Sequence, residues 1–304
     1  MLKYYIESSR PRTLPLALAN TITGSALAYA DGGFRWSVLL LAMVTTLLLQ
    51  VLSNMANDYG DFRNGKDTSE RIGPRRMVQA GKISPRAMLR AIAIVVFLIL
   101  ISGTWLIIEG FSNFKLQTAI PGMIVFGVLG LTAIVAAIKY TVGKNPYGYK
   151  AMGDLFVFIF FGLIGVLGTY FLHTGQLYGL LVLPSVAIGF LSVGVLNLNN
   201  LRDYESDKKT GKRTLVVVLG LRNARYYHLI LLMGAVVLVS LYTLLDSHCG
   251  WQWMFWLAFP LIFKNMKAVA SFSDHKQLFP ELKRLSMASL LFALLFAAGL
   301  LICT

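Results

Sequence analysis

The chain has 304 residues, of which 56% are hydrophobic and only 14% are charged, and its formal net charge is +14. An ordinary soluble domain carries about 25% charged residues, so the composition excludes a soluble globular protein and indicates a membrane protein with several spans. In a soluble protein this positive charge would suggest nucleic acid. Here the basic residues are distributed as in membrane loops, so no nucleic-acid partner is expected.

Long apolar segments alternate with short polar loops from the N-terminus onward. The start, "MLKYYIESSRPRTLPLALAN", lacks the short apolar core and cleavage site of a signal peptide, so the first helix is expected to remain. The apolar segments have roughly the 17 to 25 residues that a membrane-spanning helix needs. Nine helices are predicted, at about residues 14–30, 37–57, 87–108, 117–138, 155–173, 178–198, 226–245, 251–263 and 285–303. The eighth is the weakest, and strand-like alternation is absent, so the predicted fold is an all-α, multi-pass membrane protein.

The positions of the basic residues predict the orientation of the chain. Of the 28 Lys and Arg residues, 26 lie before the first predicted helix or in the loops that follow even-numbered helices. Only Arg35 and Lys115 lie in the other loops. The positive-inside rule therefore places the N-terminus and the long polar loops in the cytoplasm and the C-terminus outside.

The loop after the second predicted helix begins with polar residues at helical spacing. Asn54, Asn57, Asp58 and Asp61 stand at i, i+3, i+4 and i+7, so they share one face if that helix continues to its polar end. Carboxylates close to the membrane are costly and tend to line functional cavities.

The sixth predicted helix ends in a similar way. Asn197, Asn200, Asp203 and Asp207 follow one another at intervals of three, three and four residues, so they also share one face if that helix continues. Aligning Asp61 with Asp203 relates the two loops as a weak internal repeat. The chain is therefore expected to form one domain over residues 1–304, built from two weakly related halves, with both loops facing one cavity.

This pattern of acids and bases suggests a metal site. The paired carboxylates would repel one another unless a positive charge lies between them, and Mg²⁺ prefers oxygen ligands together with substrate phosphates. Two Mg²⁺ ions clamping a diphosphate fit both loops, and nearby basic side chains would meet the outer phosphate oxygens. These bases are Lys66, Arg71, Arg75, Arg76, Lys208, Lys209, Lys212 and Arg213. The alternative, ordinary solvated loop charges, is favoured for Glu70 and Glu205.

Three short motifs carry a resemblance to a known family. They are "NDYGD" with Asn57 and Asp61, "DYESD" with Asp203 and Asp207, and "YTVGK" with Tyr140 and Lys144. On these residues the chain resembles the UbiA superfamily of intramembrane aromatic prenyltransferases. The resemblance implies nine transmembrane helices around a central cavity and two aspartate-rich cytoplasmic loops.

One departure from the general family pattern points to a branch. The last carboxylate of the first motif would stand at Gly65, and the next aspartate is Asp67. That spacing, with "RIGPRRMVQAGKIS" and "YTVGKNPYGYKAMGDLFVFIFFG", is similar to the menaquinone branch, the 1,4-dihydroxy-2-naphthoate polyprenyltransferases. Whether Asp58 or Asp67 completes the first metal site stays open.

The resemblance implies an enzyme of the bacterial cytoplasmic (inner) membrane that joins a polyprenyl diphosphate to 1,4-dihydroxy-2-naphthoate, with no obligatory protein partner. Carbon dioxide and diphosphate leave, giving demethylmenaquinone. The expected metal ligands are Asn54, Asn57, Asp58, Asp61 and Asp67 at one Mg²⁺ and Asn200, Asp203 and Asp207 at the other. The expected diphosphate contacts are Lys66, Arg71, Arg75, Lys144, Arg202 and Lys208.

Asp61, Asp203, Tyr140 and Lys144 are the expected catalytic residues. Tyr140 would face the allyl cation with its ring, and its alternative is a tyrosine of the interfacial belt. Arg10 and Arg12 either approach the acceptor carboxylate or anchor the N-terminus by snorkelling.

Other functions are also compatible with the residues. The first alternative is a prenyltransferase of the same family with another aromatic acceptor, such as 4-hydroxybenzoate. A cation-coupled transporter is a more remote one, because its polar sites belong near the bilayer midplane and these acids gather at one surface. A non-catalytic lipid-binding scaffold is the third.

Overall fold

The computed structural model describes residues 1–66, 72–73, 76–246 and 249–304. This part of the chain is helical, and its one β contact is an isolated parallel bridge between Lys150 and Arg213. The α-helices are α1 (Leu2–Ser8), α2 (Leu14–Ala30), α3 (Trp36–Arg63), α4 (Pro85–Gly110), α5 (Leu116–Lys139), α6 (Gly153–Val157), α7 (Thr169–Thr174), α8 (Val182–Arg202), α9 (Tyr204–Lys209), α10 (Leu215–Leu245), α11 (Phe259–Ser271) and α12 (Leu278–Cys303). Between them lie the short or irregular helices η1 (Pro11–Thr13), η2 (Tyr147–Tyr149), η3 (Phe158–Gly168), η4 (Gly179–Leu181), η5 (Gly250–Ala258) and η6 (His275–Gln277).

Every predicted apolar segment is helical in the structure. The segment 14–30 coincides with α2, and the predicted ends of α4 and α5 lie within two residues of the observed ones. The largest difference is at α10, which begins at Leu215 rather than at residue 226 and breaks helical geometry at Gly220, where φ is 74°. Glycine adopts this left-handed backbone without a Cβ penalty, so the helix can bend there.

Seven helices in the described part of the chain are long and apolar enough to cross a membrane. They are Trp36–Arg63, Pro85–Gly110, Leu116–Lys139, Gly153–Thr174, Gly179–Arg202, Leu215–Leu245 and His275–Cys303. Helix α2, with 17 residues, and α11, with 13, are shorter. The prediction of an all-α, multi-pass membrane protein is confirmed as a fold class, and the count of nine spans is approximate.

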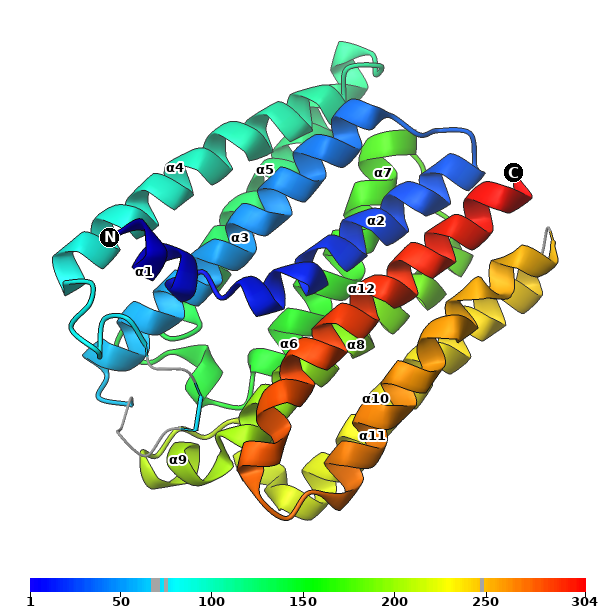
Figure 1. Ribbon diagram of the computed structural model, residues 1–304. Helices are drawn as coiled ribbons and strands as arrows, with labels where there is room; N and C mark the ends of the chain where they lie inside the picture. Colours follow the sequence, from blue (N-terminus) through cyan, green and yellow to red (C-terminus); the bar gives the residue numbers. More distant parts are fainter. Residues whose placement is uncertain (67–71, 74–75, 247–248) are drawn as a thin grey trace.

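The long helices lie side by side as one bundle (Figure 1). Helix α8 packs against α10, α12 and η3, and α2 packs against α12 and α3. The main apolar core lies where these helices meet and includes Leu27, Leu191 and Phe292. In Figure 1 the short helix α9 and the start of α12 lie at one end of the bundle, and the C-terminus lies at the opposite end.

One span departs from α-helical geometry in its middle. The segment η3 is a π-helical stretch of 11 residues between α6 and α7, and π-helical turns are frequent at functional sites. A Cβ at Gly162 would lie 2.7 Å from the Cα of Gly189 and 2.9 Å from the carbonyl oxygen of Ser185. Glycine therefore allows η3 to lie directly against α8, and the opposite side of η3 faces the cavity described below.

The two helices that carry the polar residues end differently. Helix α3 continues through Asp61 to Arg63, as the spacing of its polar residues predicts. Helix α8 stops at Arg202, Asp203 caps it, and Asp207 lies on the separate helix α9. The residues from Asn197 to Asp207 therefore do not share one continuous helical face, because the chain turns at Asp203.

Candidate functional site

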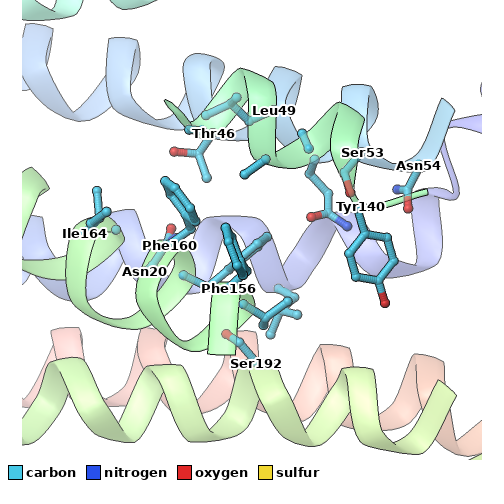
Figure 2. Close-up of a pocket in the computed structure, with 18 of the residues that line it drawn as sticks. Asn20, Thr46, Leu49, Ser53, Asn54, Tyr140, Phe156, Phe160, Ile164 and Ser192 are labelled. Carbon is cyan, nitrogen blue, oxygen red and sulfur yellow. The ribbon is translucent and has the colours of Figure 1, made fainter. Parts of the chain in front are cut away.

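A cavity of about 310 Å³ lies inside the bundle. Its walls are mostly apolar and aromatic, and Figure 2 shows Leu49, Phe156, Phe160 and Ile164 facing it, with Tyr140 toward one end. Polar and charged residues line it as well, among them Asn57, Asp61, Arg76, Asn199 and Lys212. These five come from the ends of α3 and α8 and from the two loops that follow, so the cavity has one charged end.

Asp61 lies at the centre of the charged end and is only 2% exposed. The guanidinium of Arg76 forms a salt bridge with its Oδ2. The hydroxyl of Tyr149 donates a hydrogen bond to its Oδ1. The Nζ of Lys212 lies 3.6 Å from Oδ2. These groups supply the positive charge and hydrogen bonds that a buried carboxylate needs.

Lys212 joins the two aspartate-containing loops. Its Nζ lies 3.6 Å from Asp61 and 3.9 Å from Oδ1 of Asp207, which is 7% exposed. The first acid belongs to α3 and the second to α9, so side chains separated by well over 100 residues share one ammonium group. The two loops therefore meet at the charged end of the cavity.

Asp203 and Arg202 form a second buried pair beside this centre. The guanidinium of Arg202 donates to both carboxylate oxygens of Asp203, at 2.8 and 2.7 Å, and to the side-chain oxygen of Asn199 at 2.8 Å. Asp203 is 4% and Arg202 3% exposed. This bidentate pair orients Asp203 at the end of α8.

Asp58 takes a different position from Asp61 on the same helix. Its carboxylate accepts hydrogen bonds from the hydroxyl of Ser8 at 3.0 Å, the backbone N–H of Met77 at 3.0 Å and that of Val78 at 3.1 Å. It is 2% exposed and does not line the main cavity within the described part of the chain. Asp58 therefore ties the N-terminal helix and the turn at residues 77–80 to α3.

The asparagines of the two polar runs also take different positions. Asn54 donates to the carbonyl oxygen of Ser9 at 2.8 Å, and the amide oxygen of Asn57 accepts from Thr141 at 3.1 Å, and both asparagines line the cavity. Asn200 is buried but lies outside the described cavity lining. Asn197 donates to the carbonyl oxygen of Ala224 at 3.2 Å, so it packs α8 against α10.

The predicted diphosphate contacts are spread more widely. Lys66 donates to the carbonyl oxygen of Thr210, which joins the first loop to the second. Lys144 is exposed beyond the end of α5, and Lys208 is exposed with its Nζ 5.9 Å from the ring centroid of Tyr204. Asp67, Arg71 and Arg75 lie outside the described residues.

Tyr140 caps the C-terminal end of α5 and lines the cavity. Its ring meets that of Tyr147 edge-on, with centroids 5.4 Å apart, and Tyr147 stacks on Phe156 at 4.1 Å. An aromatic wall therefore lies next to the charged end.

Arg76, Lys212 and Tyr149 contact Asp61 but are absent from the expected metal ligands, diphosphate contacts and catalytic residues. Arg76 and Lys212 are named above only among the bases expected near the phosphates. Arg76 and Lys212 belong to the basic runs, but spacing alone does not distinguish them from their neighbours. Tyr149 has no signal in the sequence beyond its place in "NPYGY". Burial, reinforced by the negative charge of Asp61, raises the pKa of the Tyr149 phenol well above its ordinary value, so the hydroxyl keeps its proton and donates.

The donors at this end suit Mg²⁺. Asp61 and Asn57 line the cavity, and Asp203 and Asp207 lie outside its described lining. Their carboxylate and amide oxygens are the ligand types that Mg²⁺ accepts. Each carboxylate lies beside a cationic side chain: Asp61 beside Arg76, Asp203 beside Arg202 and Asp207 beside Lys212. In the described residues no three acidic, histidine or cysteine side chains converge, so substrate oxygens, waters or further residues would complete the coordination.

The comparisons with known proteins agree with this fold. The model of the UbiA prenyltransferase family matches residues 17–278. The chain belongs to the UbiA prenyltransferase family, and it is an integral membrane protein.

Two relatives are similar over almost their whole length. The chain is 46% identical to the 1,4-dihydroxy-2-naphthoate octaprenyltransferase of Escherichia coli (strain K12), covering 97% of this chain and 94% of that protein. It is 45% identical to the protein of the same name from Haemophilus influenzae, covering 99% and 96%. A UbiA homolog from Archaeoglobus fulgidus bound to GPP and Mg²⁺ has a similar fold, with a TM-score of 0.60 at 18% identity, covering 98% of this chain and 99% of that one.

Proposed function

We propose that this protein transfers a polyprenyl group from polyprenyl diphosphate to 1,4-dihydroxy-2-naphthoate, with release of carbon dioxide and diphosphate. The observation that carries the proposal is the division of the cavity into a long apolar part and one buried charged end. A polyprenyl diphosphate likewise consists of a long apolar chain and one charged end. The names of the two full-length relatives support the naphthoate acceptor.

The charged end is the proposed diphosphate site. Lys212 and Arg76 already lie against Asp61 and line the cavity, and Lys66 lies beside the second loop. We infer that Arg76 and Lys212 join Lys66 as diphosphate contacts. Arg71, Arg75, Lys144, Arg202 and Lys208 remain proposed contacts.

The proposed metal ligands are Asp61 and Asn57 at the first site and Asp203 and Asp207 at the second, with Asn54 and Asn200 as further candidates. Two Mg²⁺ ions would supply Lewis-acid stabilisation of the negative charge that develops on the leaving diphosphate. The GPP and Mg²⁺ bound to the Archaeoglobus fulgidus homolog are consistent with this assignment.

Asp58 has a structural role in this proposal. Its two oxygens already accept three hydrogen bonds from Ser8, Met77 and Val78. We therefore assign Asp67, rather than Asp58, as the further carboxylate of the first metal site.

The rest of the cavity governs what happens after the allylic C–O bond breaks. The electron pair of that bond leaves with diphosphate, and the allyl cation must meet the electron-rich acceptor ring rather than water. Apolar walls from η3 and α5 would exclude water, and the rings of Tyr140 and Phe156 can stabilise the cation.

The proposal also includes the arrangement of the chain. The protein would be a single domain of two weakly related halves in the bacterial cytoplasmic membrane, with its charged loops in the cytoplasm and its C-terminus outside. The bias of the basic residues toward one side supports this orientation.

A panel of acceptors tests the function. Purified protein receives labelled polyprenyl diphosphate with Mg²⁺ and either 1,4-dihydroxy-2-naphthoate or 4-hydroxybenzoate, and labelled product is separated by chromatography. Product is expected only from the naphthoate, and only while Mg²⁺ is present. Product from 4-hydroxybenzoate alone would refute the assignment of the acceptor.

A further inference from the structure

The loop between α5 and α6 is fastened to both of its neighbours at the charged end. The N–H of Gly148 donates to the carbonyl oxygen of Tyr140 at 3.0 Å. The N–H of Ala151 donates to the carbonyl oxygen of Arg213 at 2.7 Å, beside the parallel bridge from Lys150 to Arg213. Tyr149 lies between these two attachments, so its position is determined by α5 on one side and by the loop after α9 on the other.

Tyr149 contacts α3 and both of the loops that meet there. Its hydroxyl donates to Oδ1 of Asp61 on α3. The Nζ atoms of Lys66 and Lys212 lie 5.8 and 5.4 Å from its ring centroid, within the range of a cation–π interaction. One residue thus holds an acid of the first aspartate loop and one lysine from each loop.

We propose that Tyr149 is a positioning residue that orients Asp61 through its hydroxyl and Lys66 and Lys212 through its ring. The proposal rests on the proposed function, because it takes Asp61 as a metal ligand and the lysines as diphosphate contacts. Partners that orient a ligating carboxylate typically change metal affinity or activity by about 10- to 100-fold when they are removed. The hydroxyl therefore governs Mg²⁺ affinity, and the ring governs the affinity for diphosphate.

Two substitutions separate these roles. Tyr149→Phe removes the hydroxyl and keeps the ring, whereas Tyr149→Leu removes both. Tyr170→Phe is the matched control, because its hydroxyl also donates to a carboxylate, that of Asp31 at 2.5 Å, away from the main cavity. Inorganic diphosphate is the probe, and its thermal stabilisation of each purified protein is measured over a range of Mg²⁺ concentrations alongside prenyl transfer.

Tyr149→Phe is expected to raise the Mg²⁺ concentration for half-maximal stabilisation roughly 10-fold or more and to leave the diphosphate response at saturating Mg²⁺ nearly unchanged. Tyr149→Leu is expected to weaken the diphosphate response as well, and Tyr170→Phe to change neither. An unchanged Mg²⁺ midpoint in Tyr149→Phe overturns this proposal alone. A parent protein with neither stabilisation nor prenyl transfer overturns the proposed function together with it.

A separate observation concerns the two cysteines. Cys249 lies directly before η5, and Cys303 is the last residue of α12. They form a disulfide with Cα atoms 5.6 Å apart. One turn before Cys303, a Cβ at Gly299 would lie 2.5 Å from the carbonyl oxygen of Trp251, so α12 and η5 are in direct contact there. Helix packing therefore brings the two sulfur atoms together.

The disulfide lies far from the charged loops. Figure 1 shows the C-terminus at the end of the bundle opposite to α9. The basic residues predict that this end is outside the cytoplasm, and disulfides persist in oxidising compartments and are rare in the cytosol. Charge distribution and cysteine pairing thus indicate the same orientation independently.

We infer that the Cys249–Cys303 disulfide forms outside the cytoplasm and links the end of α12 to η5. The two thiols lose their protons and pass two electrons by exchange to the disulfide of an extracytoplasmic oxidoreductase, which is reduced to two thiols. This inference does not depend on the proposed activity.

Thiol labelling in cells tests it. Cells that express the full chain are quenched in acid, and the denatured protein is treated with maleimide-linked polyethylene glycol before or after reduction. No added mass is expected before reduction and two additions afterwards, whereas Cys303→Ser is expected to take one addition without reduction. Two additions to the unreduced parent overturn the inference, as does a bond that still forms in cells lacking extracytoplasmic thiol oxidation.

Discussion

Asp61 illustrates how one side chain connects the whole charged end of the cavity. Arg76, Lys212 and Tyr149 all contact it, and each comes from a different loop. In Asp61→Asn the two cations lose their shared negative partner, and the first proposed metal loses a carboxylate. Prenyl transfer is expected to fall by about 10²- to 10³-fold, as when one group that stabilises transition-state charge is removed.

The measurement is the rate of labelled product formation with both substrates saturating. Asp31→Asn is a suitable control, since Asp31 also accepts a tyrosine hydrogen bond but lies outside the described lining of the main cavity. Near-normal turnover by Asp61→Asn would contradict the assignment.

Asp58 and Asp67 are expected to respond differently to the same change. Asp58→Asn weakens the contacts to Ser8, Met77 and Val78, so it is expected to lower the free energy of unfolding by about 1–3 kcal/mol. Asp67→Asn is expected instead to raise the Mg²⁺ requirement. Thermal unfolding and Mg²⁺ titration of activity distinguish the two, and a changed Mg²⁺ requirement in the stable Asp58→Asn protein would reverse the assignment.

At the scale of the helices, α3 and the end of α5 meet at Gly60. A Cβ there would lie 2.5 Å from the hydroxyl oxygen of Thr141 and 2.7 Å from its carbonyl carbon and oxygen. Thr141 in turn donates to the carbonyl oxygen of Ala56 at 3.0 Å. Because backbone atoms cannot move aside as a flexible side chain can, Gly60→Ala must separate the two helices beside Asp61.

Gly60→Ala is therefore expected to destabilise the protein by about 1–3 kcal/mol, the usual range for overpacking, and to reduce prenyl transfer. Gly127→Ala on α5 is the matched control, because no atom lies within 4 Å of its added Cβ. Thermal unfolding in detergent or lipid measures both variants. Equal stability of the two would show that the α3–α5 contact can relax.

The two polar runs, at the ends of α3 and α8, were both predicted to continue as helix, and only the first does so. The polar run on α3 was correctly predicted to remain helical to the last turn. The corresponding run at α8 is broken at Asp203, where Arg202 pairs with the acid next to it. This contact between neighbouring residues leaves no trace in the i, i+3, i+4 pattern, so the break was not predicted.

At the scale of the whole molecule, the orientation in the membrane is open to a direct test. A reporter enzyme that is active only outside the cytoplasm, fused after Thr304, is expected to be active. The same reporter fused after Ser84, in the loop before α4, is expected to be inactive. The opposite pair of results would invert the proposed topology and remove the reason for placing the disulfide outside.

The sequence by itself determined the fold class, the positions of the apolar helices and the two loops that carry the acids. These features depend on local quantities: the length of an apolar run, the 3.6-residue period and the distribution of Lys and Arg. Only the tertiary structure decided which polar residues meet. Asp58 and Asp61 stand three residues apart on one helix, yet one anchors Ser8 and the other meets Lys212. Tyr149 reaches Asp61 across 88 residues of sequence, because such contacts depend on how separate helices pack and not on any spacing along the chain.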